Sequence, residues 1–250
     1  ATQSGFTLGE TSPSCPNVEA LNGQAVTVPM TVSLSDRFNN PVPDGTAVSF
    51  HTDGGQVQGQ CFTSGNPAAS RCSVVWSNEN PRKAGGRVIV LGVAIGEESF
   101  TDANGNGQFD ATESFTDIGE PYIDSGFAGH YVSGDYFYDF NNDGVWTPPN
   151  AKFDGLLCND PSNTGKCGSK TTAIGAPALI ITSGSTPDII RAGGPNGTAL
   201  ASGGTLANLS LAAGSGVYSF YIADINNNPL PAGTTIGLST QSSKITITGS

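Results

Sequence analysis

Apolar and polar residues alternate along the N-terminal part of the chain in a way that predicts β-strands. Between 26 and 34 every second residue is apolar, namely Val26, Val28, Met30, Val32 and Leu34. This period of two is typical of a strand with one buried face. The apolar runs AVSFHT, CSVVW and RVIVLGVAI follow, and no stretch of eleven residues has the 3.6-residue period of a helix. The pattern therefore predicts an all-β fold of the sandwich type.

The chain also contains an internal repeat. Residues 36–52 read DRFNNPVPDGTAVSFHT, and residues 224–240 read DINNNPLPAGTTIGLST. The turn residues and the apolar positions after them coincide, which indicates two copies of one structural unit. The copies lie 188 residues apart, whereas a sandwich of the immunoglobulin (Ig) type takes about 100 residues, so roughly 70 to 80 residues are extra.

The extra residues coincide with an acidic segment. Between 97 and 155 the chain carries twelve of its 21 acidic residues and a single base, Lys152. We predict domain 1 at 1–178 with an insertion at about 98–170. We predict an incomplete domain 2 at 179–250, beginning with the strand ALIIT. The net charge of −11 argues against nucleic acid as a partner. No apolar run is long enough to span a membrane.

One part of the insertion has the spacing of an EF-hand calcium loop. Residues 102–113 read DANGNGQFDATE, with Gly107 at the sixth position, where such loops turn sharply. Calcium prefers six to eight oxygen ligands. The oxygen-bearing positions are the candidate ligands: Asp102, Asn104, Asn106, the backbone carbonyl of Gln108, Asp110 and Glu113. A solvated acidic turn is the alternative.

Weaker versions of the same loop follow. In the loop that starts at residue 139, position 12 is Asn150 instead of an acid, and Asp154 is the predicted substitute. Its other candidate ligands are Asp139, Asn141, Asp143 and the backbone of Val145. The loop 124–135 has lost its ligands at positions 3 and 5. Four acids are therefore expected to serve neighbouring ions: Asp117, Glu120, Asp124 and Asp135. We expect about two calcium ions in all.

The flanks of these loops are not helical, because the preceding segment is β-branched and the following one contains Gly119 and Pro121. A calcium switch that opens a helix pair is therefore not expected. The insertion holds twelve of the twenty aromatic residues, which we expect to form its core. The alternative is a surface on which sugar rings stack, formed by Tyr136, Phe137, Tyr138 and Trp146.

Five cysteines are consistent with an oxidising compartment. The pairs Cys61/Cys72 and Cys158/Cys167 are close in sequence and enclose turn-forming residues, so two local disulfides are predicted, with Cys15 left over. Neither histidine stands in a metal-pair spacing, and no nucleophile or phosphate-binding motif is present. An enzymatic function is therefore not expected.

The residues SDRFNNPVPDGTAVSFHTDGG, a cysteine pair and then SVVWSNENPR and GRVIVLGVAIGEESF resemble the bacterial Ig-like domains of invasin- and intimin-type surface proteins. The likeness covers about 21–100 well and 179–250 more loosely. It implies tandem Ig-like sandwiches in a secreted or outer-membrane-anchored protein that adheres to a surface protein or glycan of a host or neighbouring cell.

The function expected from these observations is structural and adhesive, with calcium stabilising the insertion of an extracellular module. Two alternatives remain open at this point. One is a carbohydrate- or receptor-binding module that uses the aromatic insertion, and the other is an accessory domain of a secreted enzyme.

Overall fold

The structure is a computed structural model of the 250-residue chain, and it describes residues 1–10, 15–16, 26–65, 70–194, 197–201 and 219–235. The chain forms two compact units, 1–182 and 183–250. Its described part contains strands and two short 3-10 turns, η1 (Gln3–Gly5) and η2 (Ala84–Gly86), and no α-helix. The all-β prediction is thereby confirmed. No helix in this part has the length and apolar character that crossing a bilayer requires.

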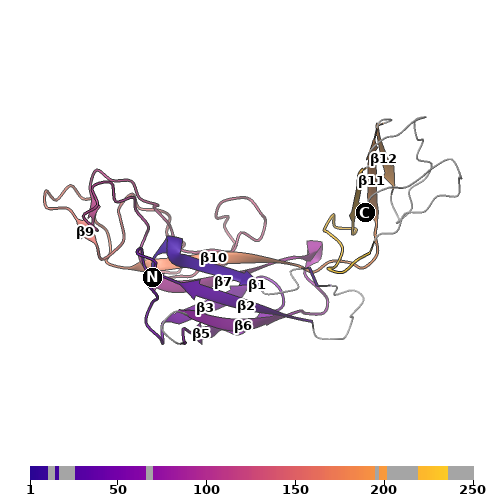
Figure 1. Cartoon of the computed structure of the whole chain (residues 1–250), viewed down its shortest axis with the longest axis horizontal. Coiled ribbons are helices and arrows are strands. Elements are labelled where there is room, and N and C mark those ends of the chain that lie inside the picture. The colour runs from indigo at the N-terminus through magenta and orange to yellow at the C-terminus, as the bar shows by residue number, and fades with distance from the viewer. Residues whose placement is uncertain (11–14, 17–25, 66–69, 195–196, 202–218, 236–250) are drawn as a thin grey trace, which may run out of the picture. The chain divides into compact units, whose positions relative to one another are not determined.

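The first unit is a β-sandwich of two four-stranded antiparallel sheets (Figure 1). One sheet has the order β1 (Phe6–Glu10), β2 (Thr27–Leu34), β6 (Arg71–Ser77) and β4 (Gln56–Val57). The other has the order β10 (Thr172–Ile181), β7 (Arg87–Gly96), β3 (Ala47–Thr52) and β5 (Gln60–Phe62). From β2 to β7, consecutive strands thus alternate between the two sheets.

The core of the sandwich lies between the sheets, as the alternation of β2 predicts. Val28, Met30, Val32 and Leu34 are all buried, whereas the residues between them are exposed or half-buried. Trp76 of β6 lies in the same core and donates its indole N–H to the carbonyl of Gly54 at 2.8 Å. Burial of this aliphatic and aromatic surface is the main source of stability for the unit.

Strand β7 is buried on both faces, in agreement with its nearly continuous apolar sequence. Its outer side chains, Ile89, Leu91 and Val93, pack against Ile123, Tyr138 and Phe140 of the insertion. The insertion runs from the end of β7 to the start of β10, at 97–171, close to the predicted bounds. The end of β10 pairs with the start of β7, including Leu179 with Ile89. The strand ALIIT therefore closes the first unit, and the boundary lies at 182/183 instead of 178/179.

Both predicted disulfides are confirmed. Cys61–Cys72 joins β5 to β6 and so connects the two sheets of the sandwich. Cys158–Cys167 closes a short loop in the insertion, where β9 (Cys158–Asn159) pairs in parallel with β8 (Phe109–Asp110). Cys15 is a half-buried free thiol.

In the second unit, β11 (Ile189–Gly194) lies between β12 (Gly197–Ala201) and β13 (Ser219–Ala223). The repeated turn has the same backbone in both units. Asp36 donates its N–H to the carbonyl of Asn40 at 2.9 Å, and Asp224 donates to Asn228 at 3.0 Å. Gly45 and Gly233 both have a φ of 85°. The predicted strand that follows at 236–240 lies outside the described residues.

Candidate metal centre

The loop 102–113 is closed by its two end carboxylates. Asp102 at position 1 accepts backbone N–H groups from Gly105 at 2.8 Å and from Gly107 at 2.8 Å. Glu113 at position 12 accepts those of Ala103 (position 2) at 2.7 Å and of Asp110 (position 9) at 3.0 Å. Because positions 4 and 6 are left-handed, with φ of 73° and 79°, glycine suits both.

The side chains at positions 3, 5 and 9 of this loop converge. The amide nitrogens of Asn104 and Asn106 both donate to the same Asp110 oxygen, each at 2.7 Å. These two hydrogen bonds lower the pKa of the Asp110 carboxyl. Each of the three side chains carries an oxygen, and the carbonyl of Gln108 stands at position 7. Such a donor set suits a hard cation such as Ca²⁺.

The loop that begins at Asp139 repeats this arrangement. The Asp139 carboxylate accepts the N–H groups of Asp143 at 3.1 Å and of Gly144 at 2.9 Å. Asn141 at position 3 donates to Asp143 at position 5 (3.0 Å) and to Thr147 at position 9 (2.9 Å). Positions 3, 5 and 9 therefore converge here as well, while the N–H of Val145 at position 7 is held by Asp143 at 2.7 Å.

Glu120 takes the place of the missing acid in this loop. Its carboxylate accepts the N–H of Phe140 (position 2) at 2.8 Å and that of Thr147 (position 9) at 3.0 Å. These are the two positions that Glu113 holds in the first loop. The Glu120 side chain is buried and comes from upstream of the loop, whereas Asp154, the predicted substitute, accepts the side-chain amide of Asn150 at position 12, at 2.8 Å. The residue at position 12 of a loop gives no information about a closing acid that comes from a different segment.

The loop 124–135 keeps the fold but not the ligands. Asp124 accepts the N–H of Ala128 at 2.7 Å and of Gly129 at 2.6 Å. Asp135 accepts N–H groups from positions 2 and 9, Ser125 at 3.3 Å and Val132 at 2.9 Å. The two acids thus close their own loop, and no oxygen-bearing side chain stands at positions 3 and 5.

A further loop of the same type is assembled from separate segments. Asp117 accepts the N–H of Asn150 at 3.0 Å and of Ala151 at 2.7 Å, as a first-position acid does with positions 5 and 6. Ala151 has a left-handed φ of 62°. Asn150 then donates its side-chain amide to Asp154 at 2.8 Å, which repeats the contact of positions 5 and 9.

Glu98 closes this split loop from the end of β7. Its carboxylate accepts the N–H of Ile118 at 2.8 Å and of Asp154 at 2.9 Å, which correspond to positions 2 and 9. Glu98 is 1% exposed and Asp154 is 5% exposed. Burial raises the pKa of the Glu98 carboxyl to about 7, against the opposing effect of the two N–H groups. Within the described residues neither acid has a lysine or arginine partner.

The aromatic rings of the insertion pack mainly against one another, and a few pack against the sandwich. Phe100, Phe109, Phe115 and Phe153 contact one another edge to face or stacked. Of the rings considered for sugar stacking, Trp146 stacks on Tyr131 at 4.5 Å between centroids. Tyr136 stacks on His51 of β3 at 3.5 Å, and Tyr138 packs on the outer face of β7. These contacts favour the interpretation of a ring core.

Arg37, in the turn after β2, joins the sandwich to the first loop. Its guanidinium donates to the carbonyl of Gly107 at 3.3 Å and lies 3.8 Å from the Asp102 carboxylate. The same group stands over the ring of Phe100, 3.6 Å from its centroid. The loop is therefore held against the sandwich by a cation–π contact and a weak ion pair.

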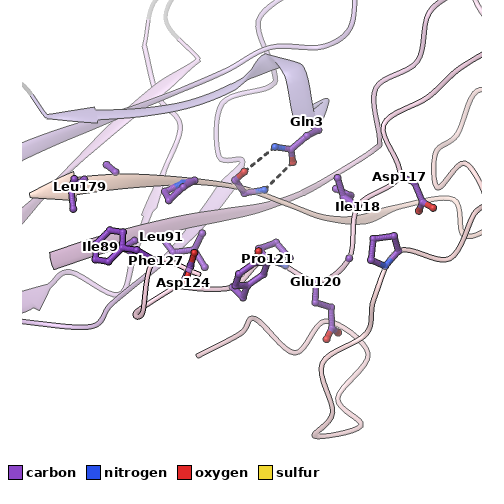
Figure 2. A pocket seen from close by; sticks show the side chains of 16 residues that line it. Gln3, Ile89, Leu91, Asp117, Ile118, Glu120, Pro121, Asp124, Phe127 and Leu179 are labelled. Atoms are coloured by element: carbon purple, nitrogen blue, oxygen red, sulfur yellow. Dashed lines mark hydrogen bonds between the residues drawn. The ribbon is translucent and has the colours of Figure 1, made fainter. Parts of the chain in front are cut away.

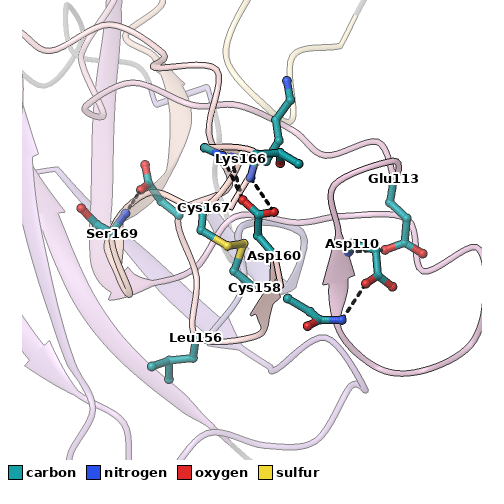
Figure 3. The surroundings of a disulfide bond; sticks show 12 residues. Asp110, Glu113, Leu156, Cys158, Asp160, Lys166, Cys167 and Ser169 are labelled. Carbon is teal, nitrogen blue, oxygen red and sulfur yellow. Dashed lines mark hydrogen bonds between the residues drawn. A yellow bond between two sulfur atoms is a disulfide. The ribbon is translucent and has the colours of Figure 1, made fainter. Parts of the chain in front are cut away.

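Two acids with structural roles were missed from the sequence. Glu98 would have emerged from the repeated pattern acid-x-ring-x-Asp at 98–102, 113–117, 120–124 and 135–139. Asp160 begins a loop inside the Cys158–Cys167 ring and accepts the N–H of Thr164 at 2.8 Å and of Gly165 at 3.0 Å (Figure 3). The sequence feature that indicates this loop is Gly165, at the sixth position counted from Asp160.

No family model, curated protein or solved structure matches this chain. Nor does the described part bring together three or more His, Cys, Asp or Glu side chains in a geometry that could hold a metal ion. The candidate ligand sets are mixed, since they combine carboxylates with amide and backbone oxygens. Assignment of the metal centre therefore depends on one loop geometry that recurs, in which the side chains of positions 3, 5 and 9 converge.

Proposed function

We propose that this chain is a non-enzymatic, calcium-stabilised region of a bacterial cell-surface or secreted adhesin-like protein, built from tandem Ig-like sandwiches. The strand orders β1-β2-β6-β4 and β10-β7-β3-β5 support the Ig-like assignment. They correspond to the A-B-E-D and G-F-C orders of that fold, with β5 added at one edge. The insertion then occupies the connection between the last two strands.

The observation that carries the calcium proposal is that oxygen-bearing side chains at positions 3, 5 and 9 converge in loops of one closing geometry. Glu113 closes the loop at 102 from its own position 12, Glu120 closes the loop at 139 from upstream, and Glu98, just after β7, closes the split loop. Each of these carboxylates accepts the N–H groups of positions 2 and 9. In the first two loops the side chains of positions 3, 5 and 9 also converge. Two ions are thus expected, with the split loop as a third candidate.

Calcium would supply charge that the protein itself lacks. The insertion carries thirteen acids and three lysines, and carboxylates hold much of its backbone, with little strand pairing. A divalent cation neutralises neighbouring carboxylates and makes their self-repulsion smaller. Extracellular sites of this kind have dissociation constants of roughly 10⁻⁴ to 10⁻³ M, which suits a protein that meets millimolar calcium.

A thermal-shift measurement tests the proposal. We expect millimolar CaCl₂ to raise the melting temperature of the wild-type chain over that in EDTA, and the double variant Asp102→Ala/Glu113→Ala to lose most of that rise. The matched control is Asp124→Ala/Asp135→Ala, which opens a loop without ligands at positions 3 and 5 and should keep the rise. Equal melting of the wild type with and without calcium would reject the proposal.

A recognition module remains the second candidate function. The rings first considered for it are engaged in contacts with other side chains of the protein, so they no longer favour it. The observation that does favour it is a groove beside the insertion.

A further inference from the structure

A groove of about 550 Å³ lies on the outer face of the sheet that contains β7 and β10, between these strands and the insertion (Figure 2). Its floor is apolar and includes Ile89, Leu91 and Leu179. Pro121 and Phe127 of the insertion form the opposite wall. The volume lies within the range of ligand sites, roughly 300 to 1,000 Å³.

The groove is the part of this face that the insertion leaves open. Ile123 and Tyr138 cover β7 on one side, whereas Phe127 is 48% exposed and Leu179 is 38% exposed. Gly175 makes the near wall possible, because a Cβ atom there would come within 3.0 Å of Pro121. Gly175 thus lets the insertion approach β10 closely at this end of the groove.

Strand addition at the nearby edge of β10 is blocked. The side-chain amide of Gln3 donates to the carbonyl of Gly175 at 2.9 Å and accepts its N–H at 3.1 Å (Figure 2). It therefore occupies the position of a neighbouring strand. Pro177, two residues further along, has no N–H to offer. An occupant of the groove must be recognised by its side chains.

The charge of the lining selects that occupant. Asp117, Glu120 and Asp124 line the groove, and no lysine or arginine does. The hydrogen bonds of all three carboxylates come from backbone N–H groups only. Glu120 and Asp117 belong to loops proposed to bind calcium. Asp124 belongs to the loop without ligands and lies near the exposed ring of Phe127, over which the guanidinium of Arg87 stands 5.7 Å from the centroid.

We propose that this groove binds an extended peptide segment of a partner protein, in which a lysine or arginine stands next to an aliphatic or aromatic side chain. The apolar side chain packs on Leu179 and Phe127, and the cation pairs with Asp124. One buried apolar side chain and one ion pair at the surface carry the recognition, so weak binding is expected. The inference depends on the groove and does not require bound calcium.

The experiment measures binding of the purified chain to an arrayed library of 12-residue peptides, followed by fluorescence titration of the strongest binders. We expect these peptides to be enriched in adjacent basic and apolar residues. Leu179→Asp should weaken binding at least tenfold, and Asp124→Asn about three- to tenfold with a smaller dependence on salt. Val75→Asp, at an exposed apolar position on the other sheet, is the matched control and should bind as wild type.

Several results would overturn the inference. One is an array without such enrichment, and another is binding that both groove variants leave unchanged. If the wild-type chain sediments as a dimer and Leu179→Asp sediments as a monomer, the groove is the interface with a second copy of the chain. Binding to a glycan array in place of peptides would assign it to a sugar. If Leu179→Asp fails to fold, Phe127→Ser provides the same test. Peptide binding in EDTA together with no calcium shift would reject the proposed function and leave this inference standing.

Discussion

The sandwich and its insertion reach an ordered structure by different physical means. In the sandwich, backbone groups pair with one another in two sheets, and apolar side chains fill the space between them. In the insertion only β8 and β9 pair as strands within the described residues, over two residues each. Many of its backbone N–H groups are satisfied by carboxylates, beside isolated β-bridges and turns, and buried N–H groups need such partners. One region thus depends on burial and the other on charge.

Because of this difference, the two regions should respond to different perturbations. Apolar burial is almost insensitive to pH and to divalent cations near neutrality. Hydrogen bonds to carboxylates are strong when the acid is ionised, but clustered acids repel one another unless a cation is present. Disturbing the sandwich should therefore lower stability under all conditions, whereas disturbing the insertion should do so conditionally.

The largest expected effect is that of Trp76→Ala in the sandwich core. Removing this buried ring leaves a cavity and takes away one of the two side-chain hydrogen bonds to the carbonyl of Gly54, at a cost of about 3–5 kcal/mol. Denaturant unfolding should give the same loss in EDTA and in calcium. The milder Trp76→Phe keeps most of the volume and should lose less. A loss that calcium restores would contradict the separation of the two regions.

The sandwich was predictable because its signals are local. The alternation of apolar and polar residues in β2 predicts which face of the strand is buried. The turn sequence shared by residues 36 and 224 onward predicts the internal repeat. The calcium loop at 102 was predictable for the same reason, since its ligands are consecutive. The boundary at 178 was not, because ALIIT is apolar in either unit and only its pairing with β7 assigns it to the first.

The closing acids were harder to predict because they act across the sequence. Glu120 closes a loop that begins nineteen residues later, and Glu98 closes one whose halves are separated by more than thirty residues. Fixed spacing within twelve residues cannot find such partners. What identifies them is the repeat acid-x-ring-x-Asp, in which the backbones of the ring residues form antiparallel β-bridges, Phe100 with Phe115 and Tyr122 with Phe137.

A smaller and local effect is expected for Glu120→Gln. An amide of the same shape can accept at one oxygen only, so one or two of the N–H groups of Phe140, Asn141 and Thr147 lose their acceptor. At roughly 1.5–3 kcal/mol for a bond to a charged group, these amides should exchange hydrogen about ten- to a hundredfold faster. Amides of β2 and β6 should keep their wild-type rates.

The control for this prediction is Glu113→Gln, which should loosen the loop at 102 and leave the loop at 139 unchanged. If Glu120→Gln accelerated exchange throughout the sandwich, the insertion and the sandwich would form one cooperative unit. The two regions would then not be stabilised independently.

The smallest expected effect is a pH dependence from Glu98 in the calcium-free protein. The pKa of this carboxyl is raised to about 7 in the folded chain, whereas an ordinary glutamate ionises near 4.5. The folded state therefore holds the proton more tightly than the unfolded one. The stability from this group is fully present below pH 4.5 and is lost as the pH rises to about 7.

Comparison with Glu98→Gln isolates this contribution. Asp110 and Asp160 have pKa values lowered by hydrogen bonds, so they act at lower pH. His51 has a pKa lowered by burial and acts in the opposite direction within the same window, but equally in both proteins. In EDTA the melting temperature of the wild type, relative to that of Glu98→Gln, should fall by a few degrees between pH 4.5 and 7. Calcium should remove this fall, because a bound cation favours the ionised acid. A constant difference across the window, in the absence of calcium, would mean that Glu98 is ionised in the folded chain and that the split loop tolerates its charge without a metal.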